Sequence, residues 1–186
     1  MSAKLARVLA VAAIAASPAV AQTPAEPQFE TGRYYAGPRV WIGNLNGAVA
    51  IGGQVERGFT QPGEYGPGII AGGIGVDYYS WSQNFGTTFG NGEWKYSVVP
   101  IQLFGNYHFV LPNNKKIDPY LGLALVYSHY SSSWSGPFAS PGGGSGSTTA
   151  FAAQGGARYF VSDKLAVQGQ VGFGYGTLGL GVTWKL

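Results

Sequence analysis

The sequence predicts an all-β protein that closes into an eight-stranded antiparallel up-and-down transmembrane β-barrel. The first observation behind this prediction is the alternation in residues 164–186, where apolar side chains occupy every second position from Leu165 to Tyr175, except at Gly169, and again from Leu178 to Leu186. Period two is the pattern of a strand with one apolar face, and a tight turn at Gly176 would join the two runs as a hairpin. An apolar face towards lipid and a small or polar face towards the lumen is the pattern of an outer-membrane barrel.

The second observation is that six further segments upstream show the same alternation. We expect these strands at about residues 39–45, 48–59, 68–81, 94–111, 117–131 and 148–161, with the terminal hairpin completing the set. Asn46-Gly47 favours a primed turn between the first two strands.

The connections between these strands alternate in length. Residues 82–93 and 132–147 are rich in glycine, serine and asparagine and are expected to be long outer loops, whereas 112–116 and 162–164 are short polar turns. The connection at 60–67 contains two prolines and is somewhat long for a periplasmic turn. Long outer loops and short periplasmic turns are typical of outer-membrane barrels, so we expect the protein in the cell outer membrane.

The third observation is the placement of charge. Charged side chains on the inward positions predict a polar lumen network of Arg39, Glu56, Asp77, Arg158 and Lys185. The expected strand directions put all of these except Asp77 in the periplasmic half, so Glu56 would be paired by several cations, and Asp77, lying higher, would need a tyrosine hydroxyl or water. An eight-stranded barrel is just wide enough for side chains to fill, which favours a polar core over a channel lining.

The outward face is expected to lack acidic residues and lysine, with Arg57 at a strand end, where an arginine reaches the headgroups. A lysine or arginine at the bilayer midplane would cost about 2–4 kcal/mol.

The N-terminus has the features of a secretory signal peptide. Lys4 and Arg7 precede the apolar segment 8–16, and the small residues of Ala19-Val20-Ala21 form a cleavage site. The apolar segment is shorter than the roughly 20 residues that a spanning helix needs. We therefore expect residues 1–21 to be a cleaved signal peptide, 22–36 a flexible periplasmic segment, and 37–186 the outer-membrane barrel.

Composition excludes several classes of function. Without Lys4 and Arg7 the chain has nine basic residues against eight acidic ones, so nucleic acid is not expected as a partner. The 31 glycines and 27 aromatic residues suit tight barrel interiors and interfacial belts. The sequence contains no cysteine, so neither disulfides nor thiol chemistry is available.

Several short stretches resemble the small outer-membrane β-barrel domain family of OmpA/OmpX type. They are Gly52-Gly53-Gln54-Val55-Glu56, Gly75-Val76-Asp77-Tyr78-Tyr79-Ser80, Val99-Pro100-Ile101, Gly105-Asn106-Tyr107-His108-Phe109, Asp118-Pro119-Tyr120-Leu121-Gly122 and Gly155-Gly156-Ala157-Arg158-Tyr159-Phe160. The resemblance implies a monomer that is inserted by the barrel-assembly machinery into outer-membrane lipids. Leu186 stands where the family commonly ends on an aromatic residue.

The leading functional hypothesis is a non-enzymatic outer-membrane protein with a structural or surface-interaction role carried by its outer loops. Candidate contacts to an extracellular ligand or surface are the loop aromatics Phe85, Phe89, Trp134 and Phe138. The alternative for these aromatics is that they mark the outer aromatic belt.

Three other functions stay open. A narrow pore is favoured by the inward glycines and opposed by inward aromatic rings. A lipid-modifying enzyme would need a nucleophile, a histidine and a carboxylate together, but His108 and His129 fall at opposite ends of the barrel. A soluble lipocalin-like barrel would need an apolar inward face, which this chain lacks. We expect no catalytic residues, no cofactor and no metal site.

Overall fold

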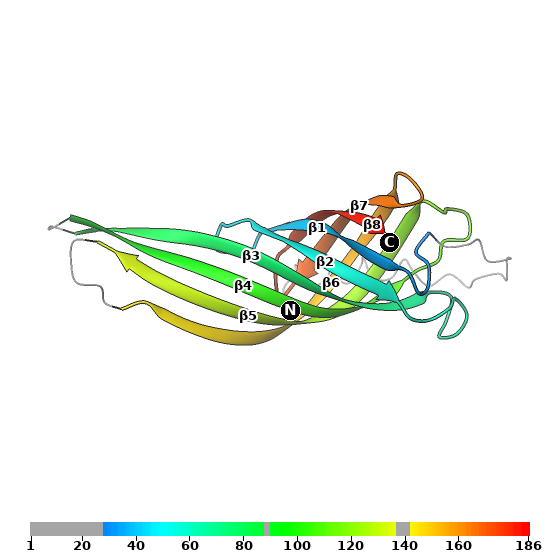
Figure 1. Ribbon diagram of the computed structural model, residues 1–186, viewed down its shortest axis with the longest axis horizontal. Coiled ribbons are helices and arrows are strands. Elements are labelled where there is room, and N and C mark those ends of the chain that lie inside the picture. Colours follow the sequence, from blue (N-terminus) through cyan, green and yellow to red (C-terminus); the bar gives the residue numbers. More distant parts are fainter. Residues whose placement is uncertain (1–27, 88–89, 137–141) are drawn as a thin grey trace, which may run out of the picture.

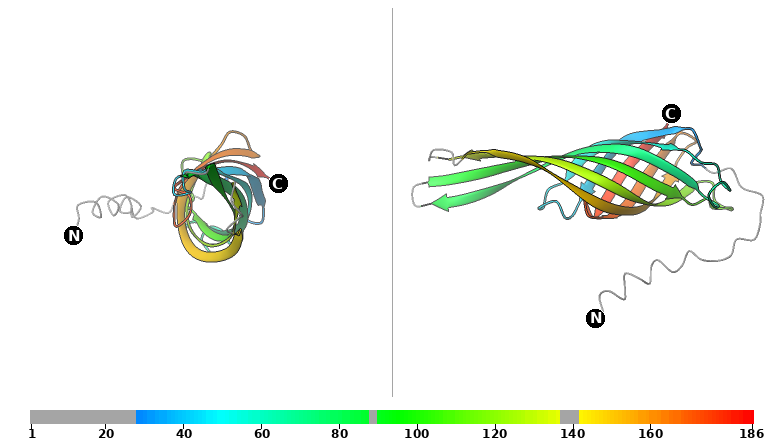
Figure 2. Two further views of the ribbon diagram at one scale, coloured as in Figure 1. Left: turned by 90° about the vertical axis from the view of Figure 1, so that its left-hand side faces the viewer. Right: turned by 90° about the horizontal axis from the view of Figure 1, so that it is seen from below.

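The computed structural model describes residues 28–87, 90–136 and 142–186. It contains eight strands: β1 (Tyr34–Ile42), β2 (Ala50–Gly58), β3 (Ile69–Thr87), β4 (Gly90–His108), β5 (Ile117–Ser135), β6 (Gly144–Phe160), β7 (Leu165–Phe173) and β8 (Leu178–Lys185). Each strand pairs antiparallel with its neighbour in sequence, and β8 pairs with β1 to close the ring (Figures 1 and 2). The prediction of an eight-stranded up-and-down barrel is confirmed.

Side chains alternate between lumen and exterior along every strand, because successive residues of a strand point to opposite faces. In β7, the buried residues Ala166, Gln168 and Gln170 alternate with exposed outward residues. The outward face is apolar, and Leu123 and Phe151 are 70% and 84% exposed. Such a belt of exposed apolar side chains around a closed barrel is suited to lipid rather than to water.

The strands fall into two length classes, and the difference gives the molecule its shape. β1, β2, β7 and β8 contain 8 or 9 residues, whereas β3 to β6 contain 17 to 19. The longer strands continue past the barrel as a four-stranded sheet on one side of its mouth (Figure 1). We call this sheet the extension, and we call the end of the barrel that carries both described chain ends the base.

The prediction of outer loops at 82–93 and 132–147 was therefore wrong for residues 82–87, 90–93, 132–135 and 144–147, which lie in strands. Residues 82–87 pair with 90–95 as a continuation of the β3/β4 ladder, and Ser132 pairs with Gly144 between β5 and β6. Glycine and serine are poor strand formers in isolation, but here they continue an antiparallel ladder whose register is already fixed by the barrel below.

The start of the barrel also differs from the expectation. Residues 22–27 and the expected signal peptide lie outside the described residues, but the end of the expected flexible segment is ordered. Phe29 is buried in the base of the lumen, and β1 begins at Tyr34 instead of Arg39. Leu45, expected at the end of the first strand, is buried in the connection to β2.

The turn expected at Asn46-Gly47 is present, within a longer connection. Both residues have positive φ, and the Ala48 amide donates to the Leu45 carbonyl over 3.0 Å. Positive φ at both central positions is the property of the primed hairpin turns. Within the described residues, no helix has the length and apolarity to cross a membrane.

Two apolar clusters fill the lumen at its two ends. The cluster at the base consists of Phe29, Tyr35, Ile69, Ala71, Phe160 and Ala166. The cluster towards the extension consists of Trp41, Leu45, Ala50, Phe104, Ala124, Val126 and Tyr175. Polar and charged side chains occupy the lumen between them.

Candidate functional site

The middle of the lumen holds a bidentate ion pair between Arg39 of β1 and Asp77 of β3. Arg39 Nε and Nη2 donate to the two carboxylate oxygens of Asp77 over 2.9 and 2.8 Å. Both side chains are at most 1% exposed. Gln102 donates to the same carboxylate over 3.3 Å, and Gln54 accepts from Arg39 Nη1 over 2.9 Å. Three of the five N–H donors of the Arg39 guanidinium thus form hydrogen bonds to Asp77 and Gln54, and the bidentate pairing supplies the partner that a buried charge requires.

A second charged layer lies nearer the base and is centred on Glu56 of β2. Its carboxylate accepts a hydrogen bond from Arg158 of β6 and one from Asn106 over 2.7 Å, and lies 3.0 Å from His108 Nε2. His108 Nδ1 lies 2.8 Å from the Asp118 carboxylate, which is 3.7 Å from Arg158 Nη1. Four strands are cross-linked through this cluster.

Glutamine side chains join the two layers. Gln54 Nε2 donates to Gln168 Oε1 over 3.0 Å, and Arg158 Nε donates to the same oxygen over 3.2 Å. The charged groups are therefore held in one continuous network with apolar clusters above and below. Phe29 closes the base, stacking on His108 with ring centroids 3.8 Å apart.

The predicted lumen residues are thus placed as follows. Arg39, Glu56, Asp77 and Arg158 all face the lumen and are buried. Arg158 pairs with Glu56 as expected. The expected pairing was wrong for Arg39, which pairs with Asp77 because the stagger of the strands puts both opposite Gly52. Lys185 lies at the base rim, where its Nζ is 2.7 Å from Glu30 Oε1.

Sequence reasoning missed two members of the network. Asp118 shares the inward parity of Tyr120, so the alternation of the expected fifth strand carried the signal for its lumen position. His108 was expected to face inward, but its place between two carboxylates depends on the register of three strands.

The inner face of the extension continues the lumen-facing parity and is aromatic. Tyr79 and Trp81 come from β3, Trp94 and Tyr96 from β4, and Trp134 from β5. The ring centroids are 5.9 Å apart for Tyr79 and Trp81, 4.9 Å for Trp81 and Tyr96, 6.3 Å for Tyr96 and Trp94, and 5.5 Å for Trp94 and Trp134. We call these five side chains the aromatic ladder.

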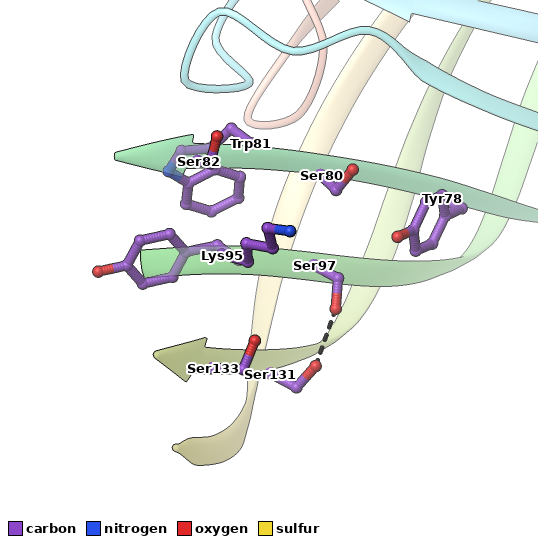
Figure 3. A pocket seen from close by; sticks show the side chains of 9 residues that line it. Tyr78, Ser80, Trp81, Ser82, Lys95, Ser97, Ser131 and Ser133 are labelled. Carbon is purple, nitrogen blue, oxygen red and sulfur yellow. Dashed lines mark hydrogen bonds between the residues drawn. The ribbon is translucent and has the colours of Figure 1, made fainter. Parts of the chain in front are cut away.

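The outer face of the extension is polar. A hollow of about 440 Å³ lies along β3, β4 and β5 and is lined by five serines, by Tyr78 and Lys95, and by the ladder residues Trp81 and Tyr96 (Figure 3). Ser97 and Ser131 are joined there across two strands by a hydrogen bond of 2.8 Å between their hydroxyls. Lys95 and Glu93 lie on this outward parity, 3.5 Å apart, which corrects the expectation of an outward face without lysine or acidic residues. Both lie beyond the apolar belt, so neither charge enters its hydrocarbon-facing part.

The predicted outer-loop residues fall into two groups. Phe85 and Trp134 lie on strands of the extension: Phe85 is 47% exposed, and Trp134 packs against Trp94. Phe89 and Phe138 lie outside the described residues.

His129 lies on the outer face of β5 and meets a serine of β6. Its Nδ1 is 3.3 Å from Ser147 Oγ, which also accepts a hydrogen bond of 2.8 Å from the Tyr127 hydroxyl. Among the described residues, no carboxylate forms a hydrogen bond with His129. The same residues contain no group of three or more His, Cys, Asp or Glu side chains that would hold a metal ion.

Comparison with known proteins identifies the fold class. No family model and no curated protein sequence matches the chain. Among solved structures, it is similar to a barrel described under "De novo design of transmembrane beta-barrels", with a TM-score of 0.50 and 15% identity over 88% of this chain and 100% of that one. The chain thus folds as a transmembrane β-barrel.

Two natural proteins show weaker likeness. The N-terminal β-barrel domain of Pseudomonas aeruginosa OprF gives a TM-score of 0.49 at 15% identity, covering 84% of this chain and 98% of that one. Ail, the attachment invasion locus protein of Yersinia pestis, gives 0.45 at 15% identity, covering 84% and 100%.

Proposed function

We propose that this protein is an integral outer-membrane β-barrel, non-enzymatic and monomeric, whose extension serves a surface-interaction role outside the cell. The observation that carries the proposal is the division of the molecule into a closed barrel with an apolar exterior and a protruding sheet with a polar exterior. The barrel satisfies its backbone hydrogen bonds within the ring, as a structure in lipid must. The extension lies beyond the apolar belt and has the composition of a water-exposed surface.

The filled lumen favours a structural barrel over a pore. Two apolar clusters and a paired charge network occupy the lumen from the base to the rim, and the largest fully buried side chains of the clusters are Trp41, Tyr35 and Phe29. Ions crossing it would have to displace buried aromatic rings or break buried ion pairs, each of which costs several kcal/mol.

The arrangement of the histidines supports a non-enzymatic role. His108 is held between Glu56 and Asp118 in the sealed lumen, where no substrate of the outer face reaches it. The His129 and Ser147 contact uses Nδ1, the nitrogen that in serine hydrolases is turned towards the carboxylate.

Insertion and export test this proposal. The chain, refolded in detergent and mixed with liposomes, should float with the lipid and run at a different gel position when heated, because a folded barrel resists the detergent until heat unfolds it. In cells it should fractionate with the outer membrane after loss of residues 1–21. A chain that stays soluble without lipid would contradict the proposal.

A further inference from the structure

We propose that the inner face of the extension binds a neutral glycan, with the aromatic ladder as the surface on which sugar rings stack. This inference rests on the proposed function, because it requires the extension to stand in water outside the cell. It adds the class of ligand and the residues that contact it.

The inner face has no wall opposite it in the described part of the chain. β1, β2, β7 and β8 end at the barrel rim, at Ile42, Ala50, Phe173 and Leu178. Below the rim, inward side chains meet one another across the lumen and are buried. Tyr79 lies at the rim and packs against the apolar cluster there, and the same parity places the other four rings above it on a one-sided sheet. All five members of the ladder remain partly exposed.

The ladder is ordered. The ring planes of Tyr79 and Trp81, of Trp81 and Tyr96, and of Trp94 and Tyr96 are inclined by 17°, 13° and 25°. These near-parallel rings come from two strands and form one strip, to which Trp134 adds a ring tilted by 55° from a third. Figure 3 shows the Trp81 side chain lying towards β4.

Glycines on neighbouring strands provide the space into which the large rings lie down. A Cβ atom at Gly92 of β4 would collide with the indole of Trp134, and one at Gly146 of β6 would collide with the Tyr130 ring. Large rings that cover glycine on the adjacent strand are a recognised means of pinning strand register. In the ladder, Trp134 lies over Gly92 in this way, whereas Tyr79, Trp81, Tyr96 and Trp94 stack on one another, so a sugar would reach the ring faces that this stacking leaves exposed.

The polarity of this face selects the ligand. In the described residues of the extension, the inward positions carry aromatic rings, glycine, hydroxyls such as Ser132 and Thr148, and the Gln83 amide, whereas the charged Glu93 and Lys95 face outward. A pyranose ring has an apolar C–H face and a rim of neutral hydroxyls, so it matches flat aromatic rings flanked by neutral donors and acceptors. A sulfated glycan or a nucleic acid would need cations, which the inward positions lack.

The test is calorimetric titration of the refolded full chain in a zwitterionic detergent without a sugar headgroup. The probes are the hexaoses of maltose, cellulose and chitin type, with a heparin hexasaccharide as the charged comparison. At least one neutral probe should bind saturably, with an affinity unchanged by added salt, because no charge is involved. Trp81→Ala with Trp94→Ala should weaken that affinity by at least about tenfold, equivalent to about 1.4 kcal/mol.

Two further variants separate stacking from folding. Glu93→Ala with Ser135→Ala, a pair of outward residues on β4 and β5 that do not line the hollow, should leave binding unchanged. Trp94→Phe, which retains a ring, should bind better than Trp94→Ala. Heat-dependent gel mobility verifies that each variant is folded.

Three outcomes of these titrations would overturn the inference while leaving the proposed barrel intact. These outcomes are a folded, inserted protein that binds none of the neutral probes, one that prefers heparin in a salt-dependent way, and one whose binding survives loss of both indoles. Self-association that disappears in the double tryptophan variant would instead assign the face to a second copy of the chain. Failure to insert in lipid would contradict the proposed function itself.

Discussion

Breaking the buried pair between Arg39 and Asp77 should destabilise the barrel far more than removing both charges together. Asp77→Ala leaves the guanidinium of Arg39 in a lumen where its side chain is 1% exposed, and Gln54 is then its one side-chain hydrogen-bond acceptor among the described residues. Removing one member of a buried ion pair costs about 3–5 kcal/mol, since the remaining charge loses its partner and cannot reach water.

The double change Arg39→Met with Asp77→Leu removes both charges and restores apolar volume. Such replacements of buried pairs are often neutral or stabilising, so we expect this variant to lie within about 1 kcal/mol of the wild type. The matched control is Lys95→Ala, which breaks the exposed pair with Glu93 and should cost less than about 1 kcal/mol.

The measurement is urea unfolding of the refolded barrel in detergent, followed by gel mobility. At a denaturant slope of about 2 kcal/mol/M, the expected loss for Asp77→Ala lowers the midpoint by about 1.5–2.5 M. The reasoning would be refuted if Asp77→Ala unfolded at the wild-type midpoint, or if the double variant were as unstable as the sum of its two single changes.

Three further results follow from the same structure. Leu123→Arg, on the lipid face of β5, should lower the unfolding free energy in lipid by about 2–4 kcal/mol, measured by urea titration in liposomes. In the same titration, Ser133→Arg on the extension should change the unfolding free energy by less than about 0.5 kcal/mol. Equal effects of the two variants would mean that the apolar belt is not in lipid. The wild-type protein should give no steady channels in planar bilayers, and channels would contradict the filled lumen. Phe29→Ala should lower the unfolding free energy by about 3–5 kcal/mol, as for other buried Phe to Ala changes. The variant should still give no channels in the same bilayers, because Trp41 and Tyr175 close the other end of the lumen. Steady conductance of this variant would show that Phe29 alone seals the barrel.

The sequence was sufficient to predict the ring of eight strands because alternation is a local property. Leu178, Leu180 and Val182 keep a single parity whatever they pair with, so the apolar face and the strand count could be predicted from the residues alone. The same local rule placed Arg39, Glu56 and Asp77 in the lumen.

The partners of those charges could not be predicted in the same way. The stagger of all eight strands decides which inward residues of different strands lie at the same height in the lumen. This stagger brings Arg39 to Asp77. The lengths of β3 to β6 were missed for another reason: the glycine, serine and asparagine content of residues 82–93 and 132–147 favoured loops over a continuation of the expected strands.

The absence of cysteine from the chain permits the most direct test of the whole arrangement. Three single variants each place one thiol: Ser133→Cys on the extension, Asp163→Cys in the base turn between β6 and β7, and Leu123→Cys on the lipid face. Each variant is treated with a membrane-impermeant maleimide. On intact cells only Ser133→Cys should react, Asp163→Cys should react once the outer membrane is permeabilised, and Leu123→Cys should react only after unfolding. Labelling of Asp163→Cys and not Ser133→Cys on intact cells would invert the orientation, and ready labelling of Leu123→Cys in the folded protein would contradict a barrel inserted in lipid.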